Sequence, residues 1–377
     1  MGPAEWIVHN EDGDKRVLVT KELPGDRWLE ILVAAGCRVE VCTSTDVLSL
    51  DEIAEHIGEA CDGVIGQLTE DWNADLFAKL AAAGGSVYSN YAVGYDNVDL
   101  DGASAAGIAV GNTPGVLTET TAEMAVSLTF ATARRIVEAD RYMRDGHFKS
   151  WLPTLFIGQR LHARTVGIIG AGRIGSAYAR MMVEGFKMNL VYFDLYPNEA
   201  LEQYVADYSK LLVSHGEEPV TCRRADSIED LLADADVVSL HTVLNDSTIH
   251  LINAERLAAM KDNGILINSS RGPIIDEAAL VEHCRTHPHF RVGLDVFEDE
   301  PAMKPGLAEL DNVVIVPHIA SASKWTREGM ATLAAANVAA MLRGYPLWDS
   351  DDVLPFVSGD VPHAAPSIIN ATELDLN

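Results

Sequence analysis

The chain has 377 residues, of which 48% are hydrophobic, so it can fill two hydrophobic cores and we expect two domains with a cleft between them. Lys and Arg number 28 against 56 Asp and Glu, a formal net charge of −28, which makes nucleic acid and anionic membranes poor partners. An acidic protein that binds a small anion needs a local cation, so we expect a buried arginine at any such pocket.

The cysteines and the apolar segments bear on the compartment. The five cysteines are odd in number and form no Cys-x-x-Cys pair, which argues against a disulfide framework and favours a soluble protein of a reducing compartment. No apolar run reaches the ~18 residues of a membrane helix. The last residues, Asp375-Leu376-Asn377, differ from the Ser-Lys-Leu peroxisomal address, so the cytosol and the matrix of a peroxisome or mitochondrion all stay open.

From Arg16 to Gly111, short β-rich runs alternate with helical stretches, which predicts a parallel sheet. A long helix is expected from Thr120 to about Arg135, with Thr120 and Glu123 at the spacing of a capping box, and we expect it to link two domains. The expected strands contain residues 17–19, 39–41, 63–65, 87–89 and 108–110, and a shorter helix is expected over 73–82.

A second alternation begins at Thr165, after an irregular aromatic segment around 151–153, and continues to Val316, so it holds a complete sheet of its own. The helical stretch from about Lys324 to Arg343 has no strand after it. We expect this helix to pack back onto the first domain, which is then discontinuous. An acidic, proline-bearing tail follows Asp349.

The second alternation opens with a glycine motif. An apolar strand over 166–169 leads into Gly170-Ala171-Gly172-Arg173-Ile174-Gly175, and helix-compatible residues follow. In this context the first glycine makes a tight turn, the second lets the backbone approach a pyrophosphate and the third allows close helix packing. The N–H groups at the helix N-terminus face the phosphates. We therefore predict a dinucleotide site in which the residues from Ala171 to Ile174 face the phosphates.

Asp194 ends the next expected strand, about 20 residues after the glycine motif. A carboxylate there accepts hydrogen bonds from the adenosine ribose hydroxyls and repels a 2′-phosphate, and the following Leu195-Tyr196-Pro197 adds no cation. The predicted cofactor is therefore NAD, with NADH preferred over NADPH.

Three ionisable residues follow strand ends in the second half, namely Arg271, Glu300 and His318, and ligands of open α/β sheets bind beyond the carboxyl ends of strands. Reduction of a 2-oxo acid needs a cationic fork for the carboxylate, a proton donor for the developing alkoxide and an anion that holds the donor imidazole. Each residue could also be an ordinary surface or loop residue. Glu300 lies in the acidic run 298–300, so the residues alone do not identify the carboxylate that acts.

Four motifs together resemble the D-isomer-specific 2-hydroxyacid dehydrogenase family: residues 170–175, Asn268-Ser269-Ser270-Arg271-Gly272, Gly293-Leu294-Asp295-Val296-Phe297 with Glu300-Pro301, and Pro317-His318-Ile319-Ala320. The resemblance covers about residues 15–347 and is greatest, through 61–72, 111–121 and 322–328, to plant-type NADH-dependent hydroxypyruvate reductases. It implies an α/β fold of two Rossmann-like or flavodoxin-like domains with parallel sheets and a deep inter-domain cleft. The implied division is a discontinuous substrate domain, 1–119 plus 321–377, and an NAD-binding Rossmann domain, 120–320.

The resemblance also implies roles for single residues. Arg271, Glu300 and His318 form the catalytic triad, and Glu300 is selected because it directly precedes a proline. The N–H groups of Val93 and Gly94 bind the substrate carboxylate together with Arg271. Relatives are homodimers whose interface contains the linker helix and the loop after it. The residues implied to line the nicotinamide side of the cofactor are Thr121, His241, Ser270, Asp295 and Ala320.

The implied activity is NADH-dependent reduction of hydroxypyruvate to D-glycerate, and of glyoxylate to glycolate, as in photorespiratory metabolism. The alternatives are a glyoxylate reductase or a D-lactate-type dehydrogenase and, from another class, an NAD(H)-sensing co-repressor-like binding protein. A metal is not expected, because the sequence has no His-Glu-x-x-His and no clustered cysteines.

Two departures from the family stand out: His241-Thr242-Val243 occurs where many relatives have His-x-Pro, and the peroxisomal C-terminal tripeptide of the plant-type proteins is missing. About 25 extra residues between Asp194 and Val220 resemble an insertion of the plant-type proteins. We expect the extra residues to form a surface helix that includes 201–213 and has no catalytic role.

Overall fold

A computed structural model describes residues 5–376, which divide into two compact units. Within this range unit 1 extends to Leu117 and resumes at Ala322, and unit 2 is Thr118–Ser321. None of the helices described is long and apolar enough to cross a membrane. Asn377 lies outside the described residues, so the structure covers only part of the terminal tripeptide considered above.

Unit 1 is built on a six-stranded sheet with the order β1-β3-β2-β4-β5-β6 among its described residues. Neighbouring strands are parallel except for β1, which pairs antiparallel with β3. The order of the five parallel strands is that of a flavodoxin-like sheet, and β1 is an additional edge strand that we did not expect. The bounds are β1 (Trp6–His9), β2 (Lys15–Val19), β3 (Cys37–Cys42), β4 (Gly63–Gly66), β5 (Val87–Asn90) and β6 (Ala109–Gly111).

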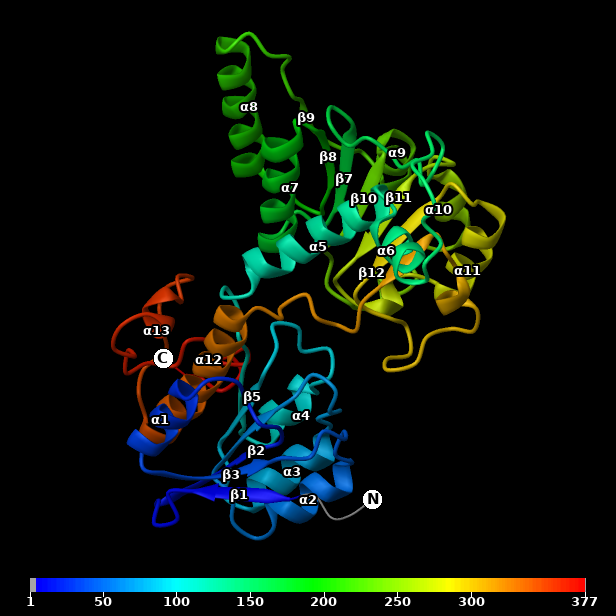
Figure 1. Ribbon diagram of the computed structural model, residues 1–377. Coiled ribbons are helices and arrows are strands. Elements are labelled where there is room, and N and C mark those ends of the chain that lie inside the picture. The colour runs from blue at the N-terminus through cyan, green and yellow to red at the C-terminus, as the bar shows by residue number, and fades with distance from the viewer. Residues whose placement is uncertain (1–4, 377) are drawn as a thin grey trace. The chain divides into compact units, whose positions relative to one another are not determined.

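The helices of unit 1 are α1 (Arg27–Ala34), α2 (Leu50–Ile57), α3 (Ala74–Ala82), α4 (Leu100–Ala105), α12 (Lys324–Arg343) and α13 (Leu354–Val357). The helix expected over 324–343 is therefore confirmed with the same bounds. Every residue from Gly329 to Ala340 on α12 is buried, because the helix packs against α1 (Figure 1) and against β4, β5 and β6. A helix that is apolar on all sides requires such cover.

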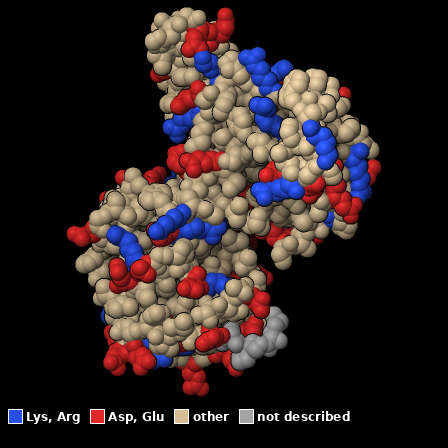
Figure 2. All heavy atoms as spheres, in the orientation of Figure 1, with Lys and Arg blue, Asp and Glu red and all other residues tan. Residues whose placement is uncertain are grey.

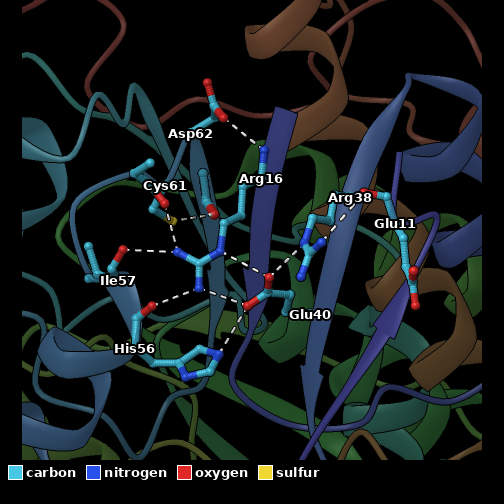
Figure 3. A network of polar contacts seen from close by, with 10 residues as sticks. Glu11, Arg16, Arg38, Glu40, His56, Ile57, Cys61 and Asp62 are labelled. Carbon is cyan, nitrogen blue, oxygen red and sulfur yellow. Dashed lines mark hydrogen bonds and ion pairs between the residues drawn. The ribbon is translucent and has the colours of Figure 1, made fainter. Parts of the chain in front are cut away.

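A polar network joins β2, β3 and α2 (Figure 3). Arg16 donates two hydrogen bonds to Glu40, at 3.0 and 2.7 Å, and others to the carbonyl groups of His56 and Ile57 at the end of α2. Arg38 and the ring of His56 also contact Glu40. Burial alone would raise the pKa of Glu40, but the hydrogen bonds and charges of Arg16 and Arg38 outweigh it and lower this pKa to about 2.

Unit 2 has a seven-stranded sheet, all parallel in the described range, with the order β13-β12-β11-β10-β7-β8-β9. This is the Rossmann order extended by one strand, with its topological switch point between β7 and β10, where ligands bind at the carboxyl edge. The bounds are β7 (Thr165–Ile169), β8 (Asn189–Phe193), β9 (Cys222–Arg224), β10 (Val237–Leu240), β11 (Ile265–Asn268), β12 (Arg291–Leu294) and β13 (Val313–Ile315).

Helices cover both faces of this sheet and form two separate cores. The helices of one face are α5 (Thr118–Ala133), α7 (Arg173–Phe186) and α8 (Glu199–Ser214); those of the other are α9 (Ile228–Asp234), α10 (Ala254–Ala259) and α11 (Glu277–Thr286). The surface helix expected in the insertion is confirmed as α8. Short 3-10 turns occur at Gly272–Ile274 and Leu307–Glu309.

The expected start of the linker helix was wrong. α5 begins at Thr118, so Thr120 lies inside its first turn and the capping box of Thr120 and Glu123 does not start the helix. An unexpected helix, α6 (Ile136–Arg144), follows directly, after Arg135 turns the chain in a left-handed conformation. The chain thus forms two helices between Thr118 and Arg144, with a sharp turn at Arg135 between them.

Candidate active site

The glycine motif forms the turn from β7 into α7 at the carboxyl edge of the unit 2 sheet. Gly170 has a φ of +93°, and a Cβ there would lie 2.7 Å from the backbone carbonyl of His241. A Cβ on Gly175 would lie 2.0 Å from the oxygen of Gly170, whereas one on Gly172 would meet nothing within 4 Å. Backbone contacts thus require the first and third glycines, and the second faces open space that a pyrophosphate can enter.

The N-terminus of α7 supplies donors for phosphates. Gly172 is its N-cap and no side chain caps the helix, so the N–H groups of Arg173 and Ile174 are available to an anion. Arg173 is also exposed. Ala171 departs from the prediction, because its N–H donates to Asp194 Oδ2 at 2.8 Å. The residues present fit a dinucleotide pyrophosphate, with the phosphate-facing N–H groups beginning at Gly172.

The surroundings of Asp194 include a cation. Asp194 follows β8 and is half-buried. Arg224, at the end of β9, donates to the carbonyl oxygens of Asp194 and Leu195 at 2.9 and 3.0 Å. This cation was missed in the prediction because the residues that directly follow Asp194 include none. Arg224 lies 30 positions later and comes close to Asp194 because β9 pairs with β8, with Arg224 opposite Tyr192. A guanidinium at this place reduces the repulsion that Asp194 exerts on a 2′-phosphate.

Three of the residues expected on the nicotinamide side are uncharged side chains of unit 2. His241 follows β10, its Nε2 is 2.9 Å from Ser239 Oγ, and burial lowers its pKa to about 3, so the ring is neutral. Ser270 follows β11 and donates to the carbonyl of Leu240 at 2.6 Å. Thr121 is buried in the first turn of α5. Each of the three side chains is uncharged, which suits contact with a nicotinamide ring.

Gly272 brings the backbone of the Arg271 loop against that of the following loop. A Cβ on Gly272 would lie 1.8 Å from the carbonyl oxygen of Phe297, so only glycine fits there. Arg271 Nη1 donates to the carbonyl of Ser270 at 2.9 Å. The positive charge of Arg271 contributes to lowering the pKa of Glu300, so the guanidinium lies within electrostatic reach of that carboxylate.

Glu300 and His318 form a hydrogen-bonded pair. His318 Nδ1 lies 2.9 Å from Glu300 Oε2, and Glu300 Oε1 accepts the N–H of Phe297 at 2.9 Å. Burial alone would raise the pKa of Glu300, but the hydrogen bond and charge of His318 outweigh it and lower this pKa. The ionised carboxylate only accepts hydrogen bonds, so Nδ1 carries a proton and Nε2 remains for proton exchange.

The three consecutive acidic residues have different partners. Glu298 accepts the N–H of the first residue of α11 at 3.1 Å, and Asp299 pairs with Lys304 at 2.7 Å. Among the residues described, only Glu300 of this run contacts His318. Of these three carboxylates, Glu300 is therefore the one that pairs with the imidazole.

Asp295 supports the loop that carries His318. It is fully buried, its carboxylate accepts the N–H groups of Ile319 and Ala320 at 2.6 and 2.8 Å, and its carbonyl accepts the N–H of His318 at 2.9 Å. Burial raises the pKa of Asp295, and the negative charge of Glu300 adds to this rise. These bonds hold His318 at a φ of +50°, a left-handed conformation that non-glycine residues rarely adopt. Asp295 and Ala320 thus form part of the scaffold of the histidine.

In unit 1, Val93 and Gly94 lie in the loop after β5 and are half-buried. The carbonyl of Val93 accepts Nδ2 of Asn112 at 2.9 Å, and that of Gly94 accepts Nδ2 of Asn90 at 3.0 Å. The N–H groups of Val93 and Gly94 donate to no acceptor within residues 5–376. Such free backbone N–H groups can receive a carboxylate.

The predicted site residues thus fall in two sets. Unit 2 brings together Arg271, Glu300 and His318, and it also carries the glycine motif and Asp194; unit 1 carries Val93 and Gly94. Over the described part of the chain, no group of three or more His, Cys, Asp or Glu residues could hold a metal ion. The five cysteines are free.

Known proteins match the chain over most of its length. Residues 126–320 match the D-isomer specific 2-hydroxyacid dehydrogenase NAD binding domain, so unit 2 is the NAD-binding part. "Glycerate dehydrogenase HPR, peroxisomal" of Arabidopsis thaliana is 60% identical over 99% of this chain and 98% of its own. A glyoxylate reductase of Korarchaeum cryptofilum is 41% identical over 87% of this chain and 93% of its own. The crystal structure of the TT0316 protein from Thermus thermophilus has a TM-score of 0.77 at 41% identity, covering 87% of this chain and 97% of that one. The chain therefore belongs to the D-isomer-specific 2-hydroxyacid dehydrogenase family.

Proposed function

We propose that the protein reduces hydroxypyruvate to D-glycerate with NADH, and glyoxylate to glycolate as a second reaction. The observation that carries this proposal is the pair of His318 Nδ1 and Glu300 Oε2 at 2.9 Å, within electrostatic reach of Arg271. It is the donor set that a 2-oxo acid needs for reduction. The similarity to a glycerate dehydrogenase favours this substrate, since oxidation of glycerate at its 2-hydroxyl gives hydroxypyruvate.

In the proposed mechanism Arg271 of unit 2 binds the substrate carboxylate with its planar guanidinium. For the free N–H groups of Val93 and Gly94 in unit 1 we also propose a role in carboxylate binding. Bound NADH supplies the hydride. Nε2 of His318 donates a proton to the developing alkoxide, while the negative charge of Glu300 stabilises the imidazolium and fixes its tautomer. The scaffold of Asp295 keeps the imidazole in place between turnovers.

We propose NADH over NADPH because the carboxylate of Asp194 follows β8, where the adenosine ribose of a dinucleotide lies in this fold. Arg224 weakens this preference, since its guanidinium is bonded to the backbone beside Asp194. The expected discrimination is therefore a difference in affinity, with measurable turnover of NADPH.

Steady-state oxidation of NADH and NADPH with hydroxypyruvate, glyoxylate and pyruvate tests these assignments. We expect the highest kcat/KM with hydroxypyruvate and NADH, about tenfold above glyoxylate, because the hydroxymethyl group adds contacts that glyoxylate lacks. A highest value with glyoxylate would make the protein a glyoxylate reductase, an alternative that the 41% identical relative favours. A highest value with pyruvate would indicate a D-lactate-type dehydrogenase. Absence of turnover with every acid would contradict an enzyme of this class and favour the alternative of a co-repressor-like binding protein.

We also propose a homodimer that assembles through α6 and the loop after it. This segment exposes several large apolar side chains, a feature typical of protein interfaces: Ile136, Val137, Met143, Phe148, Trp151, Leu152 and Ile157. For the compartment we propose an organelle matrix or the cytosol, because the five cysteines are free and a relative at 60% identity is named peroxisomal.

A further inference from the structure

The loop that presents Val93 and Gly94 is held by its carbonyl groups. The carbonyls of residues 92–94 accept, in chain order, from the N–H of Thr113 at 2.9 Å, from Nδ2 of Asn112 at 2.9 Å and from Nδ2 of Asn90 at 3.0 Å. Three consecutive carbonyls therefore point into unit 1. The N–H groups of Val93 and Gly94 have no acceptor in the described chain, so the loop offers its donors to a ligand.

The chemistry of the partners fixes the orientation of Asn112. A carbonyl oxygen only accepts, so the atom of Asn112 that faces Val93 must be its amide nitrogen. The amide oxygen then accepts the hydroxyl of Ser367 at 2.6 Å. Asn112 is 7% exposed, which leaves solvent little part in orienting this amide.

Ser367 belongs to the C-terminal tail, which is docked on unit 1. Its N–H donates to Oδ1 of Asn337 at 2.9 Å, and Nδ2 of Asn337 donates to the carbonyl of Asn112 at 3.0 Å. Asn337 is fully buried on α12. The next tail residue, Ile368, bridges to Gly111 on β6. Two buried amides and one hydroxyl thus connect the tail to the loop of Val93.

We propose that the C-terminal tail sets the affinity for the substrate carboxylate: Asn112 is a positioning residue for the loop of Val93 and Gly94, and Ser367 holds Asn112 in its working orientation. The inference rests on the proposed function, which assigns the carboxylate to the N–H groups of this loop. Donors that are fixed in advance bind an anion without the cost of ordering them. Loss of the Asn112 contact frees the loop, so it weakens carboxylate binding and leaves the dinucleotide site in unit 2 intact.

The test compares Asn112→Asp, Ser367→Ala and the wild-type enzyme. The variant Asn112→Asp has nearly the same shape but places an acceptor against the carbonyl of Val93. We expect it to raise KM for hydroxypyruvate, and Kd for the unreactive 2-oxo acid analogue oxamate on the NADH-loaded enzyme, by about tenfold or more. Ser367→Ala removes one neutral hydrogen bond and should raise both by about fivefold. Kd for NADH should change in neither variant.

Asn370→Asp is the matched control. Asn370 lies on the same tail and is 2% exposed, but its amide bonds to Val110, Ile108 and Ser104 and not to the loop. We expect Asn370→Asp to lower the melting temperature and to leave the KM for hydroxypyruvate and the Kd for oxamate unchanged.

Two results would overturn the inference: an unchanged oxamate Kd in folded Asn112→Asp, or an equal rise in Asn370→Asp, which would make general docking of the tail the cause. If Asn112→Asp does not fold, Ser367→Ala decides, and an unchanged oxamate Kd in this variant overturns it. A wild-type enzyme that reduces no 2-oxo acid would refute the proposed function alone, since oxamate binding is measured without turnover.

Discussion

Two carboxylates lie near the imidazole of His318, and their surroundings separate their properties. Asp295 is fully buried and its pKa is raised, whereas hydrogen bonds lower the pKa of Glu300. Asp295 uses both oxygens on backbone N–H groups and Glu300 uses one on Nδ1 of His318. Asp295 thus fixes the backbone of the histidine loop, and Glu300 fixes the imidazole ring. Both side chains are carboxylates, so their different surroundings give them these different roles.

Replacement of Glu300 by Gln tests this division. The amide has the shape of the carboxylate but no charge to stabilise the imidazolium, so we expect kcat for reduction to fall about 10- to 100-fold with KM for NADH unchanged. Asp299→Asn is the control, because Asp299 is adjacent and pairs with Lys304. Steady-state kinetics of both variants provide the measurement, and equal losses would contradict a specific role for Glu300.

The sequence predicts which residue types form the site, but not all of their partners. Arg271 and His318 follow from their places after strands. Spacing could not choose among three consecutive acidic residues, since the choice depends on which side chain turns toward His318. Arg224 and Asn112 were missed because their partners come from other strands and from the tail: Asn112 and Ser367 are 255 positions apart. The signal visible in the sequence is a polar residue at or directly after the end of a strand, as at Asn90 and Asn112.

At the scale of single elements, the start of α7 fits against the glycine turn so closely that no side chain can stand at Gly175. A Cβ on Gly175 would lie 2.0 Å from the oxygen of Gly170, whereas one on Gly185 of the same helix would meet nothing within 4 Å. We expect Gly175→Ala to displace the first turn of α7 and to raise Kd for NADH about 100-fold. Gly185→Ala should leave Kd unchanged and add about 0.5–1 kcal/mol of stability. Fluorescence titration with NADH distinguishes the two, and similar affinities would disprove this fit.

The network of Glu40 fixes the position of α2 on the sheet. The folded pKa of about 2 lies below the ordinary 4.5, so the ionised carboxylate stabilises the fold above pH 4.5 and this contribution is lost as the pH falls toward 2. We expect Glu40→Gln to lose up to about 3 kcal/mol at neutral pH and about half of that at pH 3. Urea unfolding at both pH values measures the difference.

Glu55→Gln is the control for this experiment, since Glu55 is an exposed residue of the same helix. It should change the urea midpoint little at either pH. A loss in Glu40→Gln that does not depend on pH would show that packing, and not charge, is responsible.

Elements with strong periodicity were predicted well and their ends less well. The runs after Arg16 and Thr165 appear as β2 and β7, and α12 has the expected bounds. The strand β1 was missed because four residues at a sheet edge carry little pattern. The start of α5 was misplaced by two residues because Thr120 and Glu123 have the spacing of a capping box although both lie inside the helix, and α6 after the turn at Arg135 was missed.

For the whole molecule, the apolar segment after α5 gives the proposed dimer a test. Met143 is 55% exposed and Ile157 is 65% exposed, while Leu211 on α8 is 52% exposed. We expect the wild type to sediment at twice the mass of one chain, and Met143→Lys or Ile157→Lys to weaken this association, because a desolvated lysine opposes burial of the interface. Leu211→Lys should remain dimeric. A monomeric wild type at micromolar concentration would exclude the dimer.

The charge of the molecule is spread over both units. Figure 2 shows acidic and basic side chains intermixed on the visible face of each. With a net charge of −28, the surface as a whole repels a 2-oxo acid, so local cations and free N–H groups must supply the attraction. This requirement explains why composition alone predicts an arginine at the site without identifying its position.

The chain enters unit 2 after Leu117 and returns to unit 1 at Ala322, so the sequence of unit 2 is inserted into the sequence of unit 1. This order has a consequence during synthesis. When the strands of unit 1 leave the ribosome, α12, which covers them, has not yet been translated. The inserted unit has all of its strands and helices in one uninterrupted stretch, so it can finish folding on the nascent chain before the unit that precedes it.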